Sequence, residues 1–290
     1  MSYNLFDLSF RVARELNVLM EGTATGGSAT TVEDSVYLTQ DDDFWNGGTV
    51  WITYDAGGAA ASPEGKWGRI TDYDKTTYKI TFTPTVTDAI VATDLYAVAD
   101  DEFPRDTIVS QINRSLSDMG RIVYTDTTTL DTADSQTEYT LPDIAGGDLK
   151  EVWLQGDDDD ADDNRWTIIN NWYVQITATG TEQELVLPYQ YAAGYGLKLV
   201  YIAPHPELRL YTDKLSETVP LNNIVYPAVL NLLRFKKQAT ENPKYDTQIV
   251  KYETLVAQLP PLPTPRKKGR LLTLGAVGEL ESEPNKVYLW

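Results

Sequence analysis

The chain's one histidine, His205, is the first residue to consider for catalysis or metal binding. It lies between two prolines in the stretch APHPE of this 290-residue chain. A general base needs a nucleophile or an orienting carboxylate beside it, and the sequence alone cannot place either one at His205. Zinc sites take several His or Cys ligands, and the chain contains no Cys. We therefore predict a structural loop histidine and no metal centre built on His205.

The acidic stretch GDDDDADDN offers clustered carboxylates, which are ligands that suit Ca²⁺. Three of its aspartates fall at the first three ligand positions of an EF-hand loop. However, Asp163 stands where that loop needs Gly, and Ile169 stands where it needs a bidentate Glu. The mismatch favours a solvated loop whose charges repel one another, and it leaves open whether residues 157–163 bind a cation.

Two further enzyme chemistries find little support in the sequence. The stretch GGAAASPEGKWG has the wrong glycine spacing for a phosphate-binding loop, and Trp67 follows Lys66 where Ser or Thr would bind Mg²⁺. Two carboxylates could serve a glycosidase, but no pair stands out among the 43 acidic residues. We therefore predict a non-enzymatic protein without a cofactor, in a structural or binding role, and keep a glycosidase as a third alternative.

The formal net charge of −19 is unevenly distributed along the chain. Residues 260–290 contain five basic and three acidic residues, so residues 1–259 carry a net charge of −21. Binding to phosphates needs clustered Lys and Arg, so the body is not expected to grip nucleic acid, although a duplex could pass through a ring with an acidic wall. Charged residues interrupt the N-terminal stretch MSYNLFDLSFRVARELNVLMEG, which therefore predicts neither a signal peptide nor a membrane span.

Four segments have apolar residues at helical spacing. The first begins at about residue 5 and ends near Gly22. The second lies within residues 102–120, with Pro104 in its first turn and Gly120 as its C-cap. Two antiparallel helices follow within residues 218–259. Because each helix has one apolar stripe, the simplest arrangement packs the four stripes together in one core.

Short runs of β-branched and aromatic residues, broken by Gly, Pro and Asp, predict two β regions. Residues 23–101 form the first, a small all-β insertion module whose role the sequence leaves open, and residues 121–217 form the second. The predicted fold class is therefore α+β, with a helical core of residues 1–22, 102–120 and 218–259 from which the β regions project. The large aromatic residues of the first region are expected to fill its core or cover its rim: Trp45, Trp51, Trp67, Tyr73 and Phe82.

The stretch LPPLPTPRKKGR opens an extended C-terminal arm, residues 260–290. Prolines fix their own φ and lack an amide donor, so neither a helix nor an inner strand can continue here. The arm is too short to fold alone, and ordering it costs about 1–2 kcal/mol per residue, so we predict that it orders on another subunit. A disordered, solubilising tail is the alternative. The arm residues expected to bind the partner are Pro261, Pro263, Pro265, Arg266, Lys267, Lys268, Arg270, Leu272, Tyr288, Leu289 and Trp290.

Several stretches resemble the head-to-tail adaptor (connector) proteins of tailed bacteriophages, which include the tail tubular proteins of short-tailed phages. They are FPRDTIVSQINRSLSDMGRI, TEYTLP, VYIAPHPEL, NIVYPAVLNLLRFKKQ and YDTQIVKYETLVAQL. The resemblance covers about residues 102–258 and the first helix, and it rests on patterns rather than on catalytic signatures. The N-terminal β module departs from the minimal family.

The resemblance implies a non-enzymatic virion protein in the phage neck, assembled in the host cytoplasm and not bound to a membrane. It would form a ring, typically a dodecamer, between the portal protein and a tail or nozzle/stopper protein. DNA would pass through the ring without sequence-specific contact, and the arm would dock on the portal or on a neighbouring subunit. The resemblance further implies that the second helix contacts the neighbouring subunit in the ring, through Arg105, Ile108, Ile112, Arg114 and Leu116.

The runner-up function is a carbohydrate-binding or cell-surface-binding module of a phage tail or baseplate. It rests on the density of Trp and Tyr in residues 44–100, because aromatic side chains form platforms for sugars. Trp45, Trp51 and Trp67 are the residues expected to form that platform.

Overall fold

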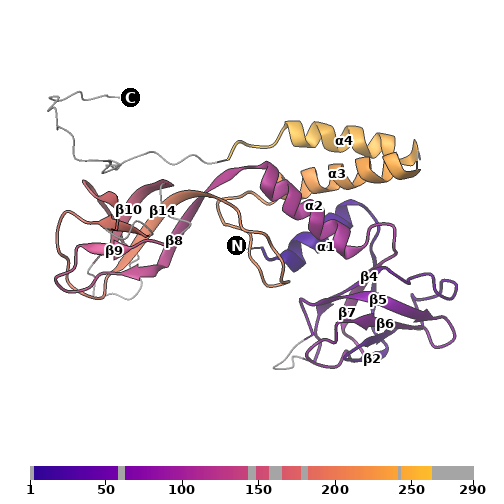
Figure 1. The fold of residues 1–290 in the computed structure, drawn as a ribbon. Coiled ribbons are helices and arrows are strands. Elements are labelled where there is room, and N and C mark those ends of the chain that lie inside the picture. The colour runs from indigo at the N-terminus through magenta and orange to yellow at the C-terminus, as the bar shows by residue number, and fades with distance from the viewer. Residues whose placement is uncertain are drawn as a thin grey trace. The chain divides into compact units, whose positions relative to one another are not determined.

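The computed structural model describes residues 3–57, 63–142, 148–156, 165–177, 182–240 and 243–262 (Figure 1). The chain divides into two compact units, each described here by itself. Unit 1 is formed by Met1–Ile122 and Pro204–Pro263, and unit 2 is built around Val123–Ala203.

A seven-stranded sheet forms the first half of unit 1. Its strand order is β1-β7-β4-β5-β6-β3-β2, and the paired strands run antiparallel. One face packs on a core of aliphatic and aromatic side chains that includes Val50, Ile52, Tyr73 and Phe82. The strands are β1 (Met20–Thr23), β2 (Gly26–Ser28), β3 (Thr31–Glu33), β4 (Thr49–Tyr54), β5 (Trp67–Asp74), β6 (Lys79–Thr83) and β7 (Leu95–Ala99).

The central strand β4 is buried on both faces. Successive side chains of a strand point to opposite faces, so Val50 and Ile52 enter the sheet's own core while Trp51 points the other way. There the indole Nε1 of Trp51 donates a hydrogen bond to Ser9 Oγ on the first helix (3.2 Å), and Phe10 packs edge-on against its ring. The five aromatic residues expected in the core or at the rim, Trp45, Trp51, Trp67, Tyr73 and Phe82, are all buried.

The first helix, α1 (Leu5–Glu15), begins at a capping box. Asn4 Oδ1 accepts from the backbone N–H of Asp7 (2.9 Å), and the backbone N–H of Asn4 donates to Asp7 Oδ2 (3.1 Å). The helix was expected to end near Gly22, and this boundary is wrong. Asn17 takes a left-handed conformation (φ 57°) directly after the helix, and the chain then enters β1.

The other three helices lie where helical spacing predicts them. The second, α2 (Arg105–Asp118), is ended by Gly120 at φ +71°, as predicted, whereas Pro104 is its extended N-cap and not part of its first turn. The last two, α3 (Asn222–Thr240) and α4 (Asp246–Ala257), pack against each other, with the short 3₁₀ helix η2 (Pro243–Tyr245) before α4. Within the described ranges, no helix combines the length and the apolar character that a membrane crossing requires.

Unit 2 contains two small antiparallel sheets around one apolar core. One has the strand order β11-β10-β14-β8 and the other β12-β13-β9. Trp172 is fully buried in the shared core, together with Leu185, Leu197 and Leu199. The strands are β8 (Arg121–Asp131), β9 (Glu138–Thr140), β10 (Leu149–Gln155), β11 (Trp166–Ile169), β12 (Tyr173–Ile176), β13 (Gln183–Val186) and β14 (Gly196–Pro204).

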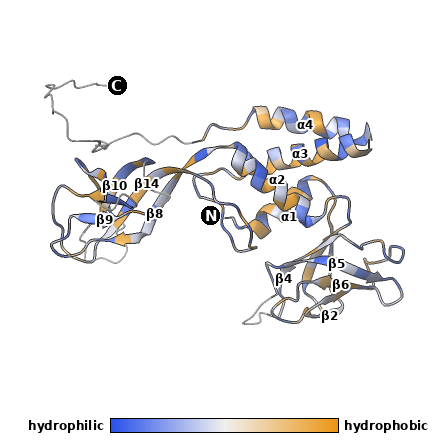
Figure 2. Ribbon diagram, in the orientation of Figure 1, coloured by the Kyte–Doolittle hydropathy of each residue, from blue (hydrophilic) through white to orange (hydrophobic). Residues whose placement is uncertain are grey.

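The predicted fold class, a helical core with β-rich insertions, is wrong. The described part of the chain is mostly β-sheet, in one seven-stranded sheet and two smaller ones, with only four α-helices. The physical reason lies in the packing of the sheets. The helices do pack on one another, α1 on α2 and α3, and α3 on α2 and α4, but the strands form sheet-based cores of their own in each unit. α1 also contacts the seven-stranded sheet, where Phe6 stacks on Trp67. Figure 2 shows hydrophobic residues alternating with hydrophilic ones along strands as well as helices.

Candidate functional site

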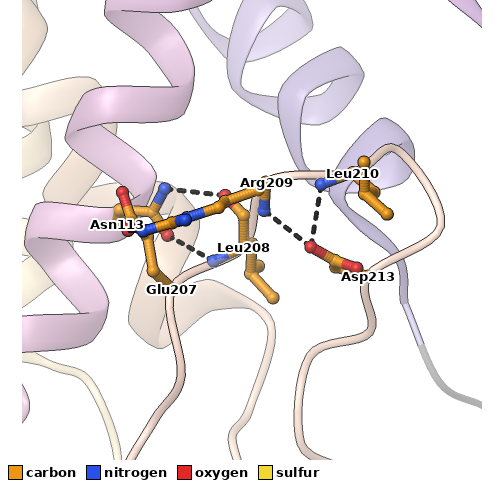
Figure 3. A network of polar contacts seen from close by, with 6 residues as sticks. All are labelled: Asn113, Glu207, Leu208, Arg209, Leu210 and Asp213. Carbon is orange, nitrogen blue, oxygen red and sulfur yellow. Dashed lines mark hydrogen bonds and ion pairs between the residues drawn. The ribbon is translucent and has the colours of Figure 1, made fainter.

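A loop that joins β14 to α3 is clamped onto α2 by one side chain. Asn113 Nδ2 donates to the carbonyl oxygen of Leu208 (2.9 Å), and the backbone N–H of Leu208 donates to Asn113 Oδ1 (2.9 Å), as Figure 3 shows. The side-chain amide thus satisfies both backbone groups of one residue, as a neighbouring strand would. Leu208 is buried beneath this clamp.

A second side chain, Asp213, closes the next turn of the loop. Its Oδ2 accepts the backbone N–H groups of Arg209 (2.6 Å) and Leu210 (2.8 Å), and its own N–H donates to the carbonyl oxygen of Leu210 (3.0 Å) (Figure 3). These hydrogen bonds, first from Arg209 and then from Leu210, hold the pKa of the Asp213 carboxyl below its usual value. The turn is therefore fixed by its own sequence.

The same loop also closes the N-terminus of α1. The first backbone N–H groups of a helix have no partner within the helix, and here those of Leu5 and Phe6 donate to the carbonyl oxygens of Asp213 (2.9 Å) and Tyr211 (3.2 Å). Further along, the N–H of Leu215 donates to the carbonyl oxygen of Tyr3 (2.8 Å). The loop backbone is thus held by both α1 and α2.

Two large apolar side chains stand out from this fixed backbone. Leu210 is 63% exposed and Tyr211 is 37% exposed. Beside them, Arg209 and Glu207 form a surface ion pair (2.7 Å). A loop that is already ordered loses little conformational entropy on binding, so this loop, residues 207–213, is suited to contact another protein.

The outer face of the helix pair α3–α4 presents a second apolar surface. Phe235 on α3 is 55% exposed, and Val250 on α4 is 61% exposed. An ion pair between Arg234 and Glu253 (2.7 Å) links the two helices. These two exposed apolar side chains make the helix pair a candidate surface for contact with another protein.

An open hollow of about 480 Å³ lies where α3 begins and α4 ends. The Asn223 side chain, which is buried there, donates to the carbonyl oxygen of Pro260 (3.1 Å) and so ties the end of α4 to the start of α3. The hollow is lined by Tyr3, Arg11, Tyr226, Leu255, Gln258 and Leu259, among others.

His205 bridges two backbone groups at the start of the loop. The backbone N–H of Ser216 donates to Nε2 (3.1 Å), so Nδ1 carries the proton and donates to the carbonyl oxygen of Pro206 (2.7 Å). Burial lowers the pKa of His205, against a smaller raising effect of the bond to Pro206. Both ring nitrogens are engaged by backbone, which is a structural arrangement.

The residues assigned to ring contacts on α2 have different surroundings. Ile108, Ile112 and Leu116 are buried inside unit 1. Arg105 is half-buried, with its guanidinium 4.6 Å from the centre of the Trp67 ring, and burial lowers its pKa. Only Arg114 points outward, in an exposed pair with Asp118 (3.8 Å). The three apolar side chains pack within their own subunit.

Most of the arm, and the acidic stretch, lie outside the described residues. Pro261 is described and exposed. The other arm residues assigned to partner binding, Pro263 to Trp290, and the candidate cation-binding residues 157–163 are not among the residues described. Among the described residues, no group of three or more His, Asp or Glu side chains could hold a metal ion.

Sequence reasoning missed the residues that shape the exposed loop. Asn113 lies in a helix, and nothing in the helix sequence indicates that its side chain binds a distant loop. Leu210 and Tyr211 are residue types that are usually buried in a core. The available signal was local, because Asp213 follows Arg209 and Leu210 at the spacing of a side-chain-capped turn. Sequence reasoning also missed that Lys198 Nζ lies 4.6 Å and 4.9 Å from the ring centres of Trp153 and Trp166 in unit 2.

Comparisons with known proteins assign no family to this chain. No protein-family model matches the sequence, and no curated protein matches it with significance.

Proposed function

We propose that the chain is a non-enzymatic structural protein of a phage virion that forms the adaptor ring between portal and tail. The observation that carries the proposal is the loop 207–213, whose fixed backbone presents Leu210 and Tyr211 to solvent. A monomer gains nothing from exposing ordered apolar side chains, whereas a subunit interface buries them.

The helix pair supports the same proposal. Phe235 on α3 and Val250 on α4 are exposed apolar side chains, and the two helices are two of the stretches that resemble the adaptor proteins. Heterologous contacts between different patches of identical chains close into rings when the rotation allows. We assign the loop 207–213 and the α3–α4 face to contacts between neighbouring subunits.

The proposed partners follow from the resemblance to the head-to-tail adaptor proteins. The portal protein lies on one side and a tail or nozzle/stopper protein on the other, with the ring in the virion neck after assembly in the host cytoplasm. DNA passes through without sequence-specific contact, in keeping with the net charge of −21 over residues 1–259. No cofactor takes part.

The test uses a matched pair of substitutions in the full chain. Leu210→Glu places a charge in the proposed interface, and Val36→Glu places the same charge at an equally exposed residue (64%) in the turn that follows β3. Mass photometry with and without purified portal rings should show at least a tenfold loss of assembly for L210E and no loss for V36E. Equal behaviour of the two variants, or absence of the protein from purified virions, overturns the proposal.

The three tryptophans predicted to bind a sugar in the carbohydrate-binding alternative are not exposed. Trp45, Trp51 and Trp67 are buried in unit 1, so their rings are not available to stack on a sugar. That function would need other aromatic side chains.

A further inference from the structure

The outer face of one sheet in unit 2 carries two tryptophans that do not enter the core. Along β10, Val152 and Leu154 point into the core, so Trp153 points to the opposite face. Lys198 on β14 lies directly across from Trp153 in the strand register. Its Nζ is 4.6 Å from the centre of the Trp153 ring and 4.9 Å from that of Trp166 on β11. Both rings are half-buried.

The neighbouring residues hold the two rings in place. The Trp166 ring reaches across β10 toward β14, where its Cη2 lies 3.4 Å from the position of a Cβ at Gly196, an ordinary contact distance. Trp153 Nε1 donates to Glu151 Oε2 (3.0 Å), which fixes the second ring. We call the side chains of Trp153, Trp166, Lys198 and Glu151 the tryptophan platform.

The platform belongs to a strongly acidic part of the chain. Residues 123–203 contain fifteen acidic and three basic residues, a net charge of −12. Glu151 is part of the platform, and an Asp131 Oδ1 lies 3.8 Å from the position of a Cβ at Gly196, beside it. Burial lowers the pKa of Lys198, while the nearby Glu151 carboxylate acts in the opposite direction and favours the cation. The carboxylates of Glu151 and Asp131 therefore favour a basic ligand beside the platform.

The same chain contains a segment with the complementary chemistry. Residues 260–270, PPLPTPRKKGR, combine four prolines with four basic residues and no acidic one. Proline-rich segments prefer the polyproline II conformation, and they bind to aromatic surfaces at a low entropy cost because their backbone is already extended. The basic residues add attraction to an acidic surface.

We propose that the tryptophan platform of one subunit binds the proline-rich, basic segment 260–270 of a second copy. Proline rings lie against Trp153 and Trp166, and the basic residues that follow face Glu151 and Asp131. This inference rests on the proposed function, because it gives the arm a defined binding surface on a neighbouring subunit.

The binding test uses the full chain with its own segment disabled. The variant R266E/K267E/K268E/R270E is labelled with 5-fluorotryptophan, and the signals of the platform are assigned with W153F and W166F. Titration with the synthetic peptide LPPLPTPRKKGR should shift the ¹⁹F signals of Trp153 and Trp166 and leave those of the buried Trp51 and Trp172 unchanged. The peptide LAALATARKKGR, which keeps the charge and lacks the prolines, should bind at least tenfold more weakly.

Charge reversal on the platform checks the same contact from the other side. D131K/E151K should weaken binding of the peptide at least tenfold, whereas a peptide with its four basic residues replaced by Glu should bind this variant better than it binds the original platform. Unchanged Trp172 and Trp51 signals show that the variant is folded. No shift at millimolar peptide, or equal binding of both peptides, overturns the inference.

Two further outcomes separate this inference from its rivals. In the unmodified chain, the Trp153 and Trp166 signals should depend on protein concentration, and independence would mean that each chain binds its own segment, which overturns docking on a second copy. If maltohexaose or cellohexaose shifts these signals while the peptide does not, the platform is a sugar site and the inference fails. Ring assembly without platform binding overturns this inference alone, and platform binding without ring assembly overturns the proposed function alone.

Discussion

The two units place the same residue type on sheets in opposite ways. In unit 1, Trp51 and Trp67 lie on the face of the seven-stranded sheet that α1 covers, and both are buried. In unit 2, Trp153 and Trp166 lie on the outer face of the four-stranded sheet, with Lys198 against them, and both stay half-buried. A strand shows two faces, and what covers the second face decides whether an aromatic residue stabilises the fold or is available to a partner.

The largest contrast is expected from removing one tryptophan in each unit. Trp51→Ala takes away a fully buried ring and its bond to Ser9, so it should lower the free energy of unfolding of unit 1 by about 3–5 kcal/mol. Trp166→Ala removes a half-buried ring and should cost about 1 kcal/mol. Urea unfolding followed by circular dichroism measures both, and equal losses would break the comparison.

Substitutions at one glycine in each unit should sharpen the comparison between the two sheets. At Gly68 an added Cβ would lie 2.4 Å from Cδ2 of the buried Phe82, which has no room to move, so Gly68→Ala should cost about 1–3 kcal/mol. At Gly196 the nearest atom, at 2.9 Å, is Oε1 at the flexible end of Gln155. Gly196→Ala should therefore cost less than about 1 kcal/mol, as measured by thermal unfolding. The reverse order would contradict the packing described for the two sheets.

Each unit also has a side chain that clamps a loop. Asn113→Ala leaves both backbone groups of Leu208 without their partner and should cost about 1–2 kcal/mol. In unit 2 the Thr132 hydroxyl donates to the carbonyl oxygen of Ala192 (2.6 Å) and accepts from the N–H of Tyr195 (3.0 Å), and Thr132→Val should cost about 1 kcal/mol. Amide exchange should speed up at Leu208 in the first variant and at Tyr195 in the second. Exchange that stays unchanged at either residue would show that the clamp does not hold its loop.

The smallest expected effect is a difference between the two units in how their stability depends on pH. His205 is the only histidine, and its pKa in unit 1 lies below its ordinary value of 6.5 because burial disfavours the charged ring. The unfolded chain then binds more protons than the folded one, so unit 1 should lose a little stability as the pH falls through 6.5, while unit 2 should not. NMR titration of the single imidazole measures the pKa directly. A pKa above 6.5 would contradict the buried, backbone-bonded geometry.

The helices and their ends follow from local sequence to a large extent. The Gly120 end of α2 was predicted because this residue acts through its own backbone, and α3 and α4 lie where apolar spacing places them. The end of α1 was not predicted. Asn17 has a left-handed backbone conformation just after this helix, and an Asn in a sequence does not by itself indicate that conformation. The fold class was wrong for another reason: the helices contact one another, but their apolar stripes do not reveal that the strands form larger cores of their own.

The contacts that form the candidate surfaces are likewise either local in sequence or between distant residues. The turn made by Asp213 depends on residues three and four positions away and was within reach of the sequence. The clamp by Asn113 joins residues 95 positions apart, and the meeting of Trp153, Trp166 and Lys198 needs three strands in register.

What the sequence determined by itself was local: the positions of α2, α3 and α4, the uneven charge and the strand-forming runs, because each depends on neighbours along the chain. The tertiary structure alone decided which face of each sheet is covered, that Trp51 is buried while Trp153 is half-exposed, and that Leu210 and Tyr211 stand out on a fixed loop. These outcomes depend on contacts between residues far apart in the chain, and no spacing within a segment encodes them.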